Sequence, residues 1–256
     1  MHVDIKTSRV VAITGGSKGI GFHLGEAFFQ AGYLVALAAR SACSIDVSNF
    51  GGRVLCFDMD VRNREDHMAF TNFVLENFGK LDVYINNAGR SEWRALPDID
   101  DIFLKEILEV NLHSCFWGAQ AAASAFESRG VILNIGSIAG KRGSANNSAY
   151  AAAKFGVTGL TQSLAKELGR KGVRVNSVCP VLVKTEGLID AIERKDGPAA
   201  GIGFERFLEQ FAESQSSLGF LPSTIDVSNM CLFLASDASQ AITGQNFNVD
   251  CGVFPQ

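Results

Sequence analysis

The sequence contains no apolar run that reaches the roughly 18 residues needed to cross a bilayer. Its first residues, Met-His-Val-Asp-Ile-Lys, lack the apolar core of a signal peptide. Basic residues form only short clusters and the net charge is −4, so the chain lacks the electrostatic footprint of a nucleic-acid binder. These absences predict a cytoplasmic protein with neither membrane nor nucleic acid among its partners.

Clusters of metal-ligating or disulfide-forming residues are also absent. The six cysteines are scattered and form no C-x-x-C pair, so we expect reduced and mostly packed thiols. The four histidines belong to different segments and show no metal-ligand spacing. The sequence therefore predicts no metal site.

Length and periodicity favour one α/β domain. With 256 residues, 47% of them hydrophobic, the chain can bury one core, whereas two domains would be cramped. We expect a single domain over residues 1–256. Runs typical of buried strands occur at 9–13, 34–38, 53–57, 81–85, 131–135, 173–178 and 246–249. Helix-like stretches lie near 19–31, 63–78, 100–127, 148–170, 188–217 and 224–234. This alternation predicts a doubly wound parallel sheet of about seven strands with helices on both faces.

Two connections depart from the regular alternation. Residues 41–52 show little amphipathic pattern, so we expect the helix there to be abbreviated or absent. After Thr185, about forty residues broken by several glycines precede the next regular helix, and we interpret residues at about 186–221 as a lid. Phe204, Phe207 and Phe211 share one helical face in this segment. They either pack that helix or line a substrate pocket.

A glycine-rich turn follows the first predicted strand and opens a helix. It reads Thr-Gly-Gly-Ser-Lys-Gly-Ile-Gly from Thr14 to Gly21. Glycines in such a turn allow a sharp bend and a close approach of the backbone to a pyrophosphate, which the helix N-terminus faces. The alternative is a purely structural turn. The loop residues that we expect to bind a dinucleotide are Gly15, Ser17, Lys18, Gly19, Ile20 and Gly21.

The residue after the second predicted strand bears on which nicotinamide dinucleotide fits. An acidic side chain there would accept from the ribose 2′-hydroxyl and repel a 2′-phosphate. Here the residue is Arg40, and residues 34–41 contain no Asp or Glu. Lys18 supplies a second cation that could reach the same phosphate. The sequence therefore favours NADP(H) over NAD(H), and the alternative is that Asp46 folds back toward the ribose and selects NAD(H).

Tyr150 and Lys154 form a Y-x-x-x-K pair in an alanine-rich stretch. Alanine favours helix, and side chains four residues apart on a helix share one face. A fixed ammonium beside a phenol favours the phenolate, which suits Tyr150 for acid/base work near neutral pH.

Polar residues also follow two of the other predicted strands. Asn86-Asn87-Ala88-Gly89 ends the fourth strand and Gly136-Ser137 ends the fifth, while Asn111 lies in the helix between them. Ligands of open parallel sheets bind at the carboxyl ends of the strands. We therefore expect the glycine-rich turn, Asn87 and Ser137 to converge at that edge.

Taken together, these motifs resemble the short-chain dehydrogenase/reductase family over nearly the whole chain. T-G-x-x-x-G-x-G, N-N-A-G, a single Asn, a Ser and Y-x-x-x-K occur in order and at that family's spacing. The resemblance implies a Rossmann-type fold and a hydride exchange between a nicotinamide cofactor and a carbonyl or alcohol. Further cofactor contacts that it implies come from Asp60 and Val61 at the adenine, from Asn87, Ala88 and Gly89, and from Pro180, Val183 and Thr185 at the carboxamide.

The same resemblance implies four catalytic roles. Tyr150 would donate a proton to the carbonyl oxygen, or accept one in the reverse direction, and Ser137 would hold that oxygen by a hydrogen bond. Lys154 would bind the hydroxyls of the nicotinamide ribose and favour the phenolate form of Tyr150. Asn111 would help carry a water chain that replenishes the proton. Departures from the family pattern are Val181, Phe220 and Cys251, which bear on substrate contacts and subunit packing.

The motifs leave the substrate open. A general NADPH-dependent carbonyl reductase comes first, with a 3-oxoacyl-thioester reductase as one form of it and a sugar, polyol or nucleotide-sugar dehydrogenase as the alternative. Docking of an acidic carrier protein would need a basic patch, for which the candidates are Arg90, Arg94, Lys141 and Arg142.

The sequence gives less support to functions other than oxidoreductase. A dinucleotide sensor without turnover would usually lack Tyr150 or Lys154, and a hydrolase based on Ser137 would need a nearby His that the sequence does not place there. Relatives in the family are tetramers or dimers built on the helices of Asn111 and Tyr150. The resemblance therefore implies a homo-oligomer that acts on a small-molecule substrate.

Overall fold

Seven parallel strands form one sheet in the order β3-β2-β1-β4-β5-β6-β7 in the computed structural model, which describes residues 8–255. The strands are β1 (Val10–Thr14), β2 (Leu34–Ala39), β3 (Val54–Asp58), β4 (Val83–Asn86), β5 (Gly130–Ile135), β6 (Val173–Pro180) and β7 (Asn246–Val249). The predicted fold, one α/β domain with a seven-stranded parallel sheet, is confirmed.

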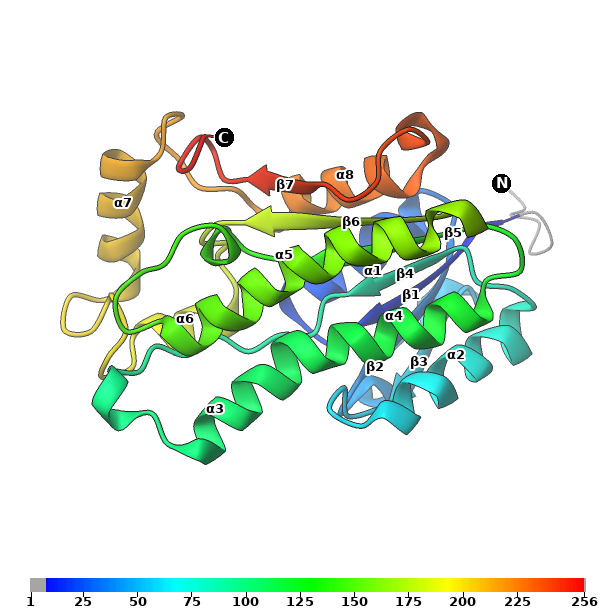
Figure 1. The fold of residues 1–256 in the computed structure, drawn as a ribbon, viewed down its shortest axis with the longest axis horizontal. Helices are drawn as coiled ribbons and strands as arrows, with labels where there is room; N and C mark the ends of the chain where they lie inside the picture. Colours follow the sequence, from blue (N-terminus) through cyan, green and yellow to red (C-terminus); the bar gives the residue numbers. More distant parts are fainter. Residues whose placement is uncertain (1–7, 256) are drawn as a thin grey trace.

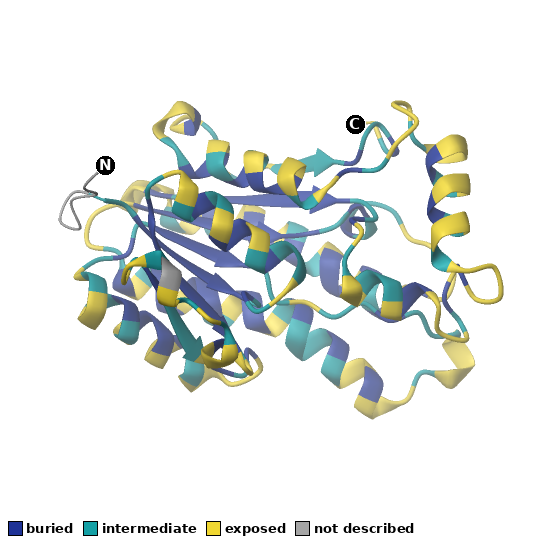
Figure 2. Cartoon of the chain, turned by 180° about the vertical axis from the view of Figure 1, so that it is seen from behind, coloured by how far each residue is buried: buried dark blue, intermediate teal, exposed yellow. Residues whose placement is uncertain are grey.

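Helices cover both faces of the sheet, as Figure 1 shows. One face carries α1 (Gly19–Gln30) and α8 (Thr224–Ala235), and the other carries α2 (Arg64–Phe78), α4 (Ser114–Ala125) and α5 (Ser148–Leu168). Alternate residues of each strand enter the two cores: Val11 and Ile13 pack on the α1 and α8 side, whereas Val10 and Ala12 pack on the other. Figure 2 shows the inner strands of the sheet as buried and the edge strands β3 and β7 as mostly half-buried. Burial on both faces explains why the inner strand runs are apolar without strict alternation.

The strand order reverses at β1, which pairs with β2 on one side and β4 on the other. Such a reversal opens a crevice at the carboxyl ends of the strands. The remaining helices, α3 (Asp101–Leu108), α6 (Glu186–Ile192) and α7 (Phe204–Gln215), lie toward that end of the sheet in Figure 1.

Two helices differ from their predicted extent. The stretch predicted at 100–127 is interrupted by a π-helical turn, Glu109–His113, between α3 and α4. The stretch predicted at 188–217 is wrong as one helix, because residues 193–203 separate α6 from α7. Gly201 and Gly203 in this connection adopt φ of 79° and 80°, a left-handed conformation that favours glycine, and Gly203 lies directly before α7. After β2, two single 3₁₀ turns, Ala42–Ser44 and Ser48–Phe50, stand where an abbreviated helix was expected.

Within the described residues, no helix is both long and apolar enough to cross a membrane. The same residues contain no group of three or more His, Cys, Asp or Glu side chains placed to hold a metal ion. All six cysteines are free thiols.

Candidate functional site

Glycines allow the loop after β1 to touch the loop after β4. Gly15 has φ of 68°, and a Cβ atom there would lie 2.8 Å from Ala88 Cα. A Cβ atom on Gly21 would collide with the Gly15 carbonyl oxygen and with Asn87 Nδ2. Gly15 therefore requires glycine because of both its backbone conformation and the space around it, and Gly21 because of space alone.

Hydrogen bonds from Thr14 and Asn87 fix the same two loops. Thr14 Oγ1 accepts from the Asn87 amide at 3.1 Å and from the Ala88 amide at 3.2 Å. Asn87 Nδ2 donates in return to the carbonyl oxygens of Thr14, at 2.9 Å, and Gly15, at 3.1 Å. Sequence reasoning had not assigned this role to Thr14, although it is the Thr of T-G-x-x-x-G-x-G.

The N-terminus of α1 carries the donors that a pyrophosphate needs. No side chain caps this terminus, and its first turn contains no acidic residue. The first amides of a helix have no partner within the helix and attract anions. Lys18 immediately before the helix is exposed, Ser17 and Ile20 are half-buried, and Gly19 faces the Thr185 side chain at 3.5 Å from its ideal Cβ position. The loop therefore fits the phosphates of a dinucleotide.

Arg40 and Asp60 lie at the same corner of the sheet, beyond β2 and β3. Arg62 Nε donates to Asp60 Oδ1 at 3.0 Å, and Arg62 Nη2 also bonds the carboxylate. Hydrogen bonds from Arg62 lower the pKa of Asp60 against the effect of burial, and the charge of the exposed Arg40 adds to the lowering. The buried His67 donates from Nε2 to the carbonyl oxygen of Val61 at 2.9 Å and so fixes the neighbouring residue.

Two other carboxylates, one in the loop beyond β2 and one at the end of β3, each accept a backbone hydrogen bond. Asp46 Oδ1 accepts from the Ser48 amide at 3.0 Å. Asp58, which pairs with Ala39 in the ladder, accepts from the Cys43 amide at 2.9 Å. Asp58 was missed in the sequence, because only the residues directly following the second strand were searched for an acid.

Lys154 is buried at the carboxyl end of β5. Its Nζ donates to the Ile135 carbonyl oxygen at 2.8 Å and lies 5.6 Å from the centre of the Tyr150 ring on the same helix. Gly140 allows the loop after β5 to pack closely against the backbone of Lys154, since a Cβ atom there would lie 2.5 Å from the Lys154 carbonyl oxygen. Ser137 follows Ile135 by two residues, and its Oγ accepts from the Ala139 amide at 3.1 Å.

Asn111 is fully buried in the π-helical turn and joins it to the loop after β4. Its Oδ1 accepts from the Arg90 amide at 3.1 Å, and its Nδ2 donates to the carbonyl oxygens of Arg90, at 2.8 Å, and Ile107, at 2.9 Å. A Cβ atom on Gly89 would lie 3.1 Å from Asn111 Oδ1 and 3.9 Å from Lys154 Nζ. The structure thus brings Asn111, Gly89 and Lys154 together. π turns occur often at functional sites.

The end of β6 borders the same edge. Pro180 is the last residue of β6, and Val183 is buried just beyond it. Thr185 Oγ1 accepts from the Leu188 amide at 3.3 Å and caps α6. The three residues predicted at the carboxamide therefore lead from the sheet directly into the segment 186–221.

The phenylalanines of α7 pack within that segment. Phe204 and Phe207 lie against a small core of Ile192, Ala199 and Leu208 that also includes Trp93. The rings of Phe207 and Phe211 are 5.9 Å apart. Packing of α7 thus accounts for these rings, and Figure 2 shows the rest of this helix as mostly exposed.

The four cations considered for a basic patch are all engaged within the chain. Arg90 and Arg94 both pair with Glu92, an acidic residue that sequence reasoning had not singled out. Lys141 Nζ donates to the Asn246 carbonyl oxygen at 2.6 Å. Arg142 stacks over the Phe254 ring. Arg90 and Arg94 thus have a carboxylate partner, whereas Lys141 and Arg142 form no ion pair among the described residues.

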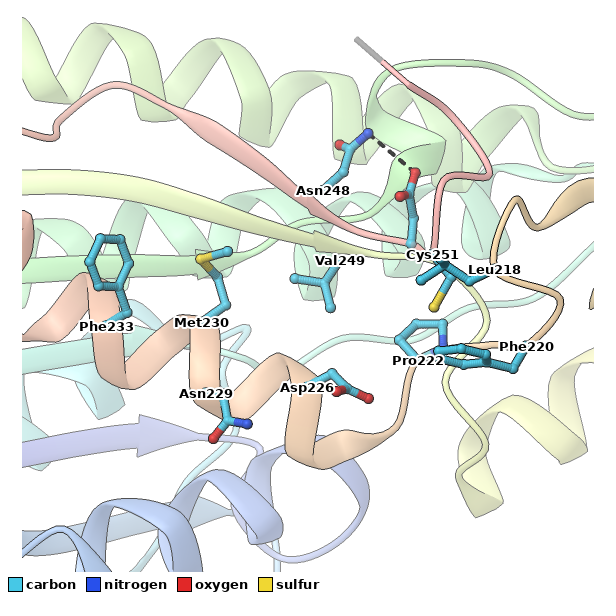
Figure 3. A pocket seen from close by; sticks show the side chains of 11 residues that line it. Leu218, Phe220, Pro222, Asp226, Asn229, Met230, Phe233, Asn248, Val249 and Cys251 are labelled. Atoms are coloured by element: carbon cyan, nitrogen blue, oxygen red, sulfur yellow. Dashed lines mark hydrogen bonds between the residues drawn. The ribbon is translucent and has the colours of Figure 1, made fainter.

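A groove of about 520 Å³ lies elsewhere, between α8, the end of β7 and residues 218–222 (Figure 3). Its lining includes Phe220, Met230, Phe233 and Cys251, and none of the predicted site residues. Cys251 adopts φ of 53°, the left-handed region that explains why glycine suits this position.

Comparisons with known proteins agree with this geometry. A family model described as enoyl-(acyl carrier protein) reductase matches residues 15–254. The chain is 33% identical to a Streptomyces virginiae protein named for a ketoacyl reductase role in the monensin polyketide synthase, over 96% of this chain and 97% of the relative. It is 32% identical to the diacetyl reductase ((S)-acetoin forming) of Staphylococcus epidermidis, over 96% and 98%. A crystal structure of an actinorhodin polyketide ketoreductase variant with NADPH superposes with a TM-score of 0.89 at 28% identity, over 97% and 98% of the two chains.

Proposed function

The chain belongs to the short-chain dehydrogenase/reductase family of NAD(P)-dependent oxidoreductases, and on this basis we propose that it reduces a small ketone to a secondary alcohol with NADPH, or runs the reverse reaction. The observation that carries the proposal is the cluster of Tyr150, Lys154, Asn111 and Gly89 at the sheet edge where the glycine-rich loop also lies.

The residues at that edge fit a dinucleotide. In the proposal, the free amides of α1 and Ser17 hold the pyrophosphate, Asp60 and Val61 border the adenine, and residues 87–89 lie along the cofactor. Pro180, Val183 and Thr185 border the carboxamide. When bound, the nicotinamide supplies or accepts the hydride at the substrate carbon.

NADPH is preferred in the proposal because of charge. Arg40 and Lys18 are both exposed and free to meet a 2′-phosphate. Asp46 and Asp58, the acids near the end of β2, already accept from the amides of Ser48 and Cys43.

The proton chemistry falls to the chain's own groups. The Tyr150 hydroxyl donates to the carbonyl oxygen of the substrate. Ser137 Oγ accepts from the Ala139 amide, so its hydrogen remains available to that same oxygen. Lys154 uses one of its three N–H donors on Ile135 and keeps two for the ribose and for a water. The side-chain amide of Asn111 is hydrogen-bonded to Arg90 and Ile107. In the proposal, Asn111 therefore holds the loop after β4 beside Lys154, where a water chain would begin.

Small ketones and diketones are the substrate class that we favour. Similarity to a diacetyl reductase supports it, and so does the pairing of Arg90 and Arg94 with Glu92, because that carboxylate offsets positive charge that docking of an acidic carrier protein would need. The second candidate is a 3-oxoacyl thioester, which the similarity to the Streptomyces virginiae relative favours.

A substrate panel with a matched pair of variants tests the proposal. NADPH oxidation would be followed with diketones, β-ketoacyl thioesters, ketoses and nucleotide-linked keto-sugars. Tyr150→Phe should lower kcat by about 10²- to 10⁴-fold, because it removes the general acid but no packing. Tyr33→Phe removes the same atom from a tyrosine outside the site and should keep full activity. Tight NADPH binding without turnover of any compound would favour a dinucleotide sensor instead.

Assembly and location complete the proposal. Phe116 on α4 and Phe155 on α5 are each 47% exposed, and they support a homo-oligomer built on these helices. The six free thiols support a reducing compartment such as the cytoplasm.

A further inference from the structure

Glu92 is a buried carboxylate held by three arginines. Its side chain is only 7% exposed. Arg90 Nη2 lies 2.6 Å from Glu92 Oε2, Arg194 Nη1 lies 2.6 Å from the same oxygen, and Arg94 Nη2 lies 2.8 Å from Oε1. Charged side chains are rarely buried unless they are paired, and breaking such a pair is costly. The carboxylate therefore ties together the segments that carry the three arginines.

One of these segments is the proposed lid. Arg194 lies between α6 and α7, more than a hundred residues from Glu92 in sequence. Two residues further, Asp196 Oδ2 accepts from the Ala95 amide at 3.3 Å. Trp93 packs against the small core of the lid segment beside Ile192. We call this set of contacts between residues 92–95 and 192–199 the clasp.

The clasp is connected to the proposed catalytic residues through Arg90. The side chain of Arg90 binds Glu92, while its backbone amide and carbonyl are both bonded to the Asn111 side chain. A second carboxylate, Glu106 on α3, also pairs with the Arg90 guanidinium. Glu92 thus lies two residues after Arg90, whose backbone bonds Asn111, and contacts Arg194 of the segment 186–221 on its other side.

We propose that Glu92 is a positioning residue that holds the segment 186–221 against the carboxyl edge of the sheet and thereby sets the affinity for the substrate; this inference rests on the proposed function. Glu92 does not touch the reacting atoms. Its loss should therefore raise KM for the ketone while leaving kcat nearly unchanged, because the segment would spend less time in the closed position.

The test uses the full chain with Trp117→Phe, which leaves Trp93 in the clasp as the one remaining tryptophan. In this background, Glu92→Gln keeps the size of the side chain but removes the charge that binds three guanidinium groups. We expect KM for the diketone to rise at least about tenfold, with kcat changed by less than about threefold. Acrylamide should quench Trp93 fluorescence more strongly, and trypsin should cut faster after Arg194.

Three further variants provide the controls. Asp98→Asn breaks the exposed ion pair between Lys195 and Asp98, 3.2 Å long, which joins the same part of the lid to a residue just beyond 92–95, and it should change KM less than about twofold. Arg194→Gln leaves Arg90 and Arg94 on Glu92, so it should fold normally and reproduce the effects on KM and quenching. Arg194→Lys, which retains the charge, should restore part of the affinity.

The readouts separate the two proposals. Unchanged KM and unchanged Trp93 quenching in Glu92→Gln and Arg194→Gln would overturn the role of Glu92 even in an active enzyme. Stronger quenching in both variants of a protein that reduces no ketone would leave the clasp standing and refute the proposed function alone.

Discussion

Some residues at the carboxyl edge of the sheet could be assigned a role from the sequence, and others could not. Gly15 and Gly21 were predicted to allow a tight turn, and the structure adds the reason, since a Cβ atom on either would strike the loop after β4. Glu92 was not anticipated. Its importance depends on Arg194, which the chain brings back from a distant segment, and no local pattern indicates that encounter.

Cofactor preference is a residue-scale property that one substitution tests. Arg40→Ala should raise KM for NADPH by about 10- to 100-fold and leave KM for NADH nearly unchanged, because a charge-assisted hydrogen bond to the 2′-phosphate contributes about 1.5–3 kcal/mol. Steady-state kinetics with both cofactors measure this ratio. Arg53→Ala, which removes a cation stacked on Phe29, is the matched control. Equal losses with both cofactors would contradict the assignment of Arg40.

Elements were predicted well where packing on the sheet repeats a simple period. All seven strands lie within two residues of their expected bounds, and the signal is strongest in β1, β2, β4 and β5, which are mostly apolar and almost wholly buried. The breaks in the helices were harder to predict. The π turn at Glu109–His113 depends on Asn111 bonding to Arg90 across the site, and the end of α6 depends on contacts of residues 194–196 with another segment. Periodicity within one helix contains neither kind of information.

The contact between α2 and β4 gives a pH-dependent prediction at the scale of elements. His67 Nε2 must carry the proton, because its partner, the Val61 carbonyl oxygen, can only accept; Nδ1 therefore accepts from the Tyr84 hydroxyl at 3.0 Å. Burial lowers the pKa of His67 below its ordinary value of 6.5, outweighing the hydrogen bond to Val61 and the nearby charge of Asp66. Above pH 6.5, His67 is neutral in the folded and the unfolded chain, so its hydrogen bonds contribute fully to the free energy of unfolding. Below that pH, the unfolded chain binds the proton first and stability falls.

Urea unfolding between pH 7.5 and 5 measures this slope, which should reach at most about 1.4 kcal/mol per pH unit for one group. His67→Gln retains a donor for Val61 and an acceptor for Tyr84 but does not titrate, so the difference from the wild type should shrink as the pH falls. His23→Gln, at an exposed position, should leave the slope in place. An identical slope in His67→Gln would show that another group governs the acid response.

At the scale of the whole molecule, the strand order explains why distant motifs meet. The reversal at β1 places the loops after β1 and β4 side by side, and parallel strands bring every carboxyl end to one edge. The doubly wound parallel sheet was predicted from the alternation of strands and helices, and the structure adds the strand order. The groove of Figure 3, by contrast, could not be predicted from the sequence, because only the tertiary fold brings residues 218–222 next to the end of β7.

The proposed assembly is tested by sedimentation velocity. We expect the wild type to sediment as a dimer or tetramer, and the double variant Phe116→Glu and Phe155→Glu to sediment as a monomer, because two charges would then face each other across an apolar contact. Ile225→Glu, at an exposed position of α8, introduces a charge outside these helices and serves as the control. A monomeric wild type at micromolar concentration would refute the oligomer.

The most direct test of the central claim follows the transferred hydrogen itself. NADPH carrying deuterium at both C4 positions of the nicotinamide would be incubated with the enzyme and a diketone, and the alcohol would be examined by mass spectrometry. The account predicts one deuterium on the new carbinol carbon and almost none of this product with Tyr150→Phe. Bound NADPH that gives no deuterated alcohol from any ketone in the panel would contradict it.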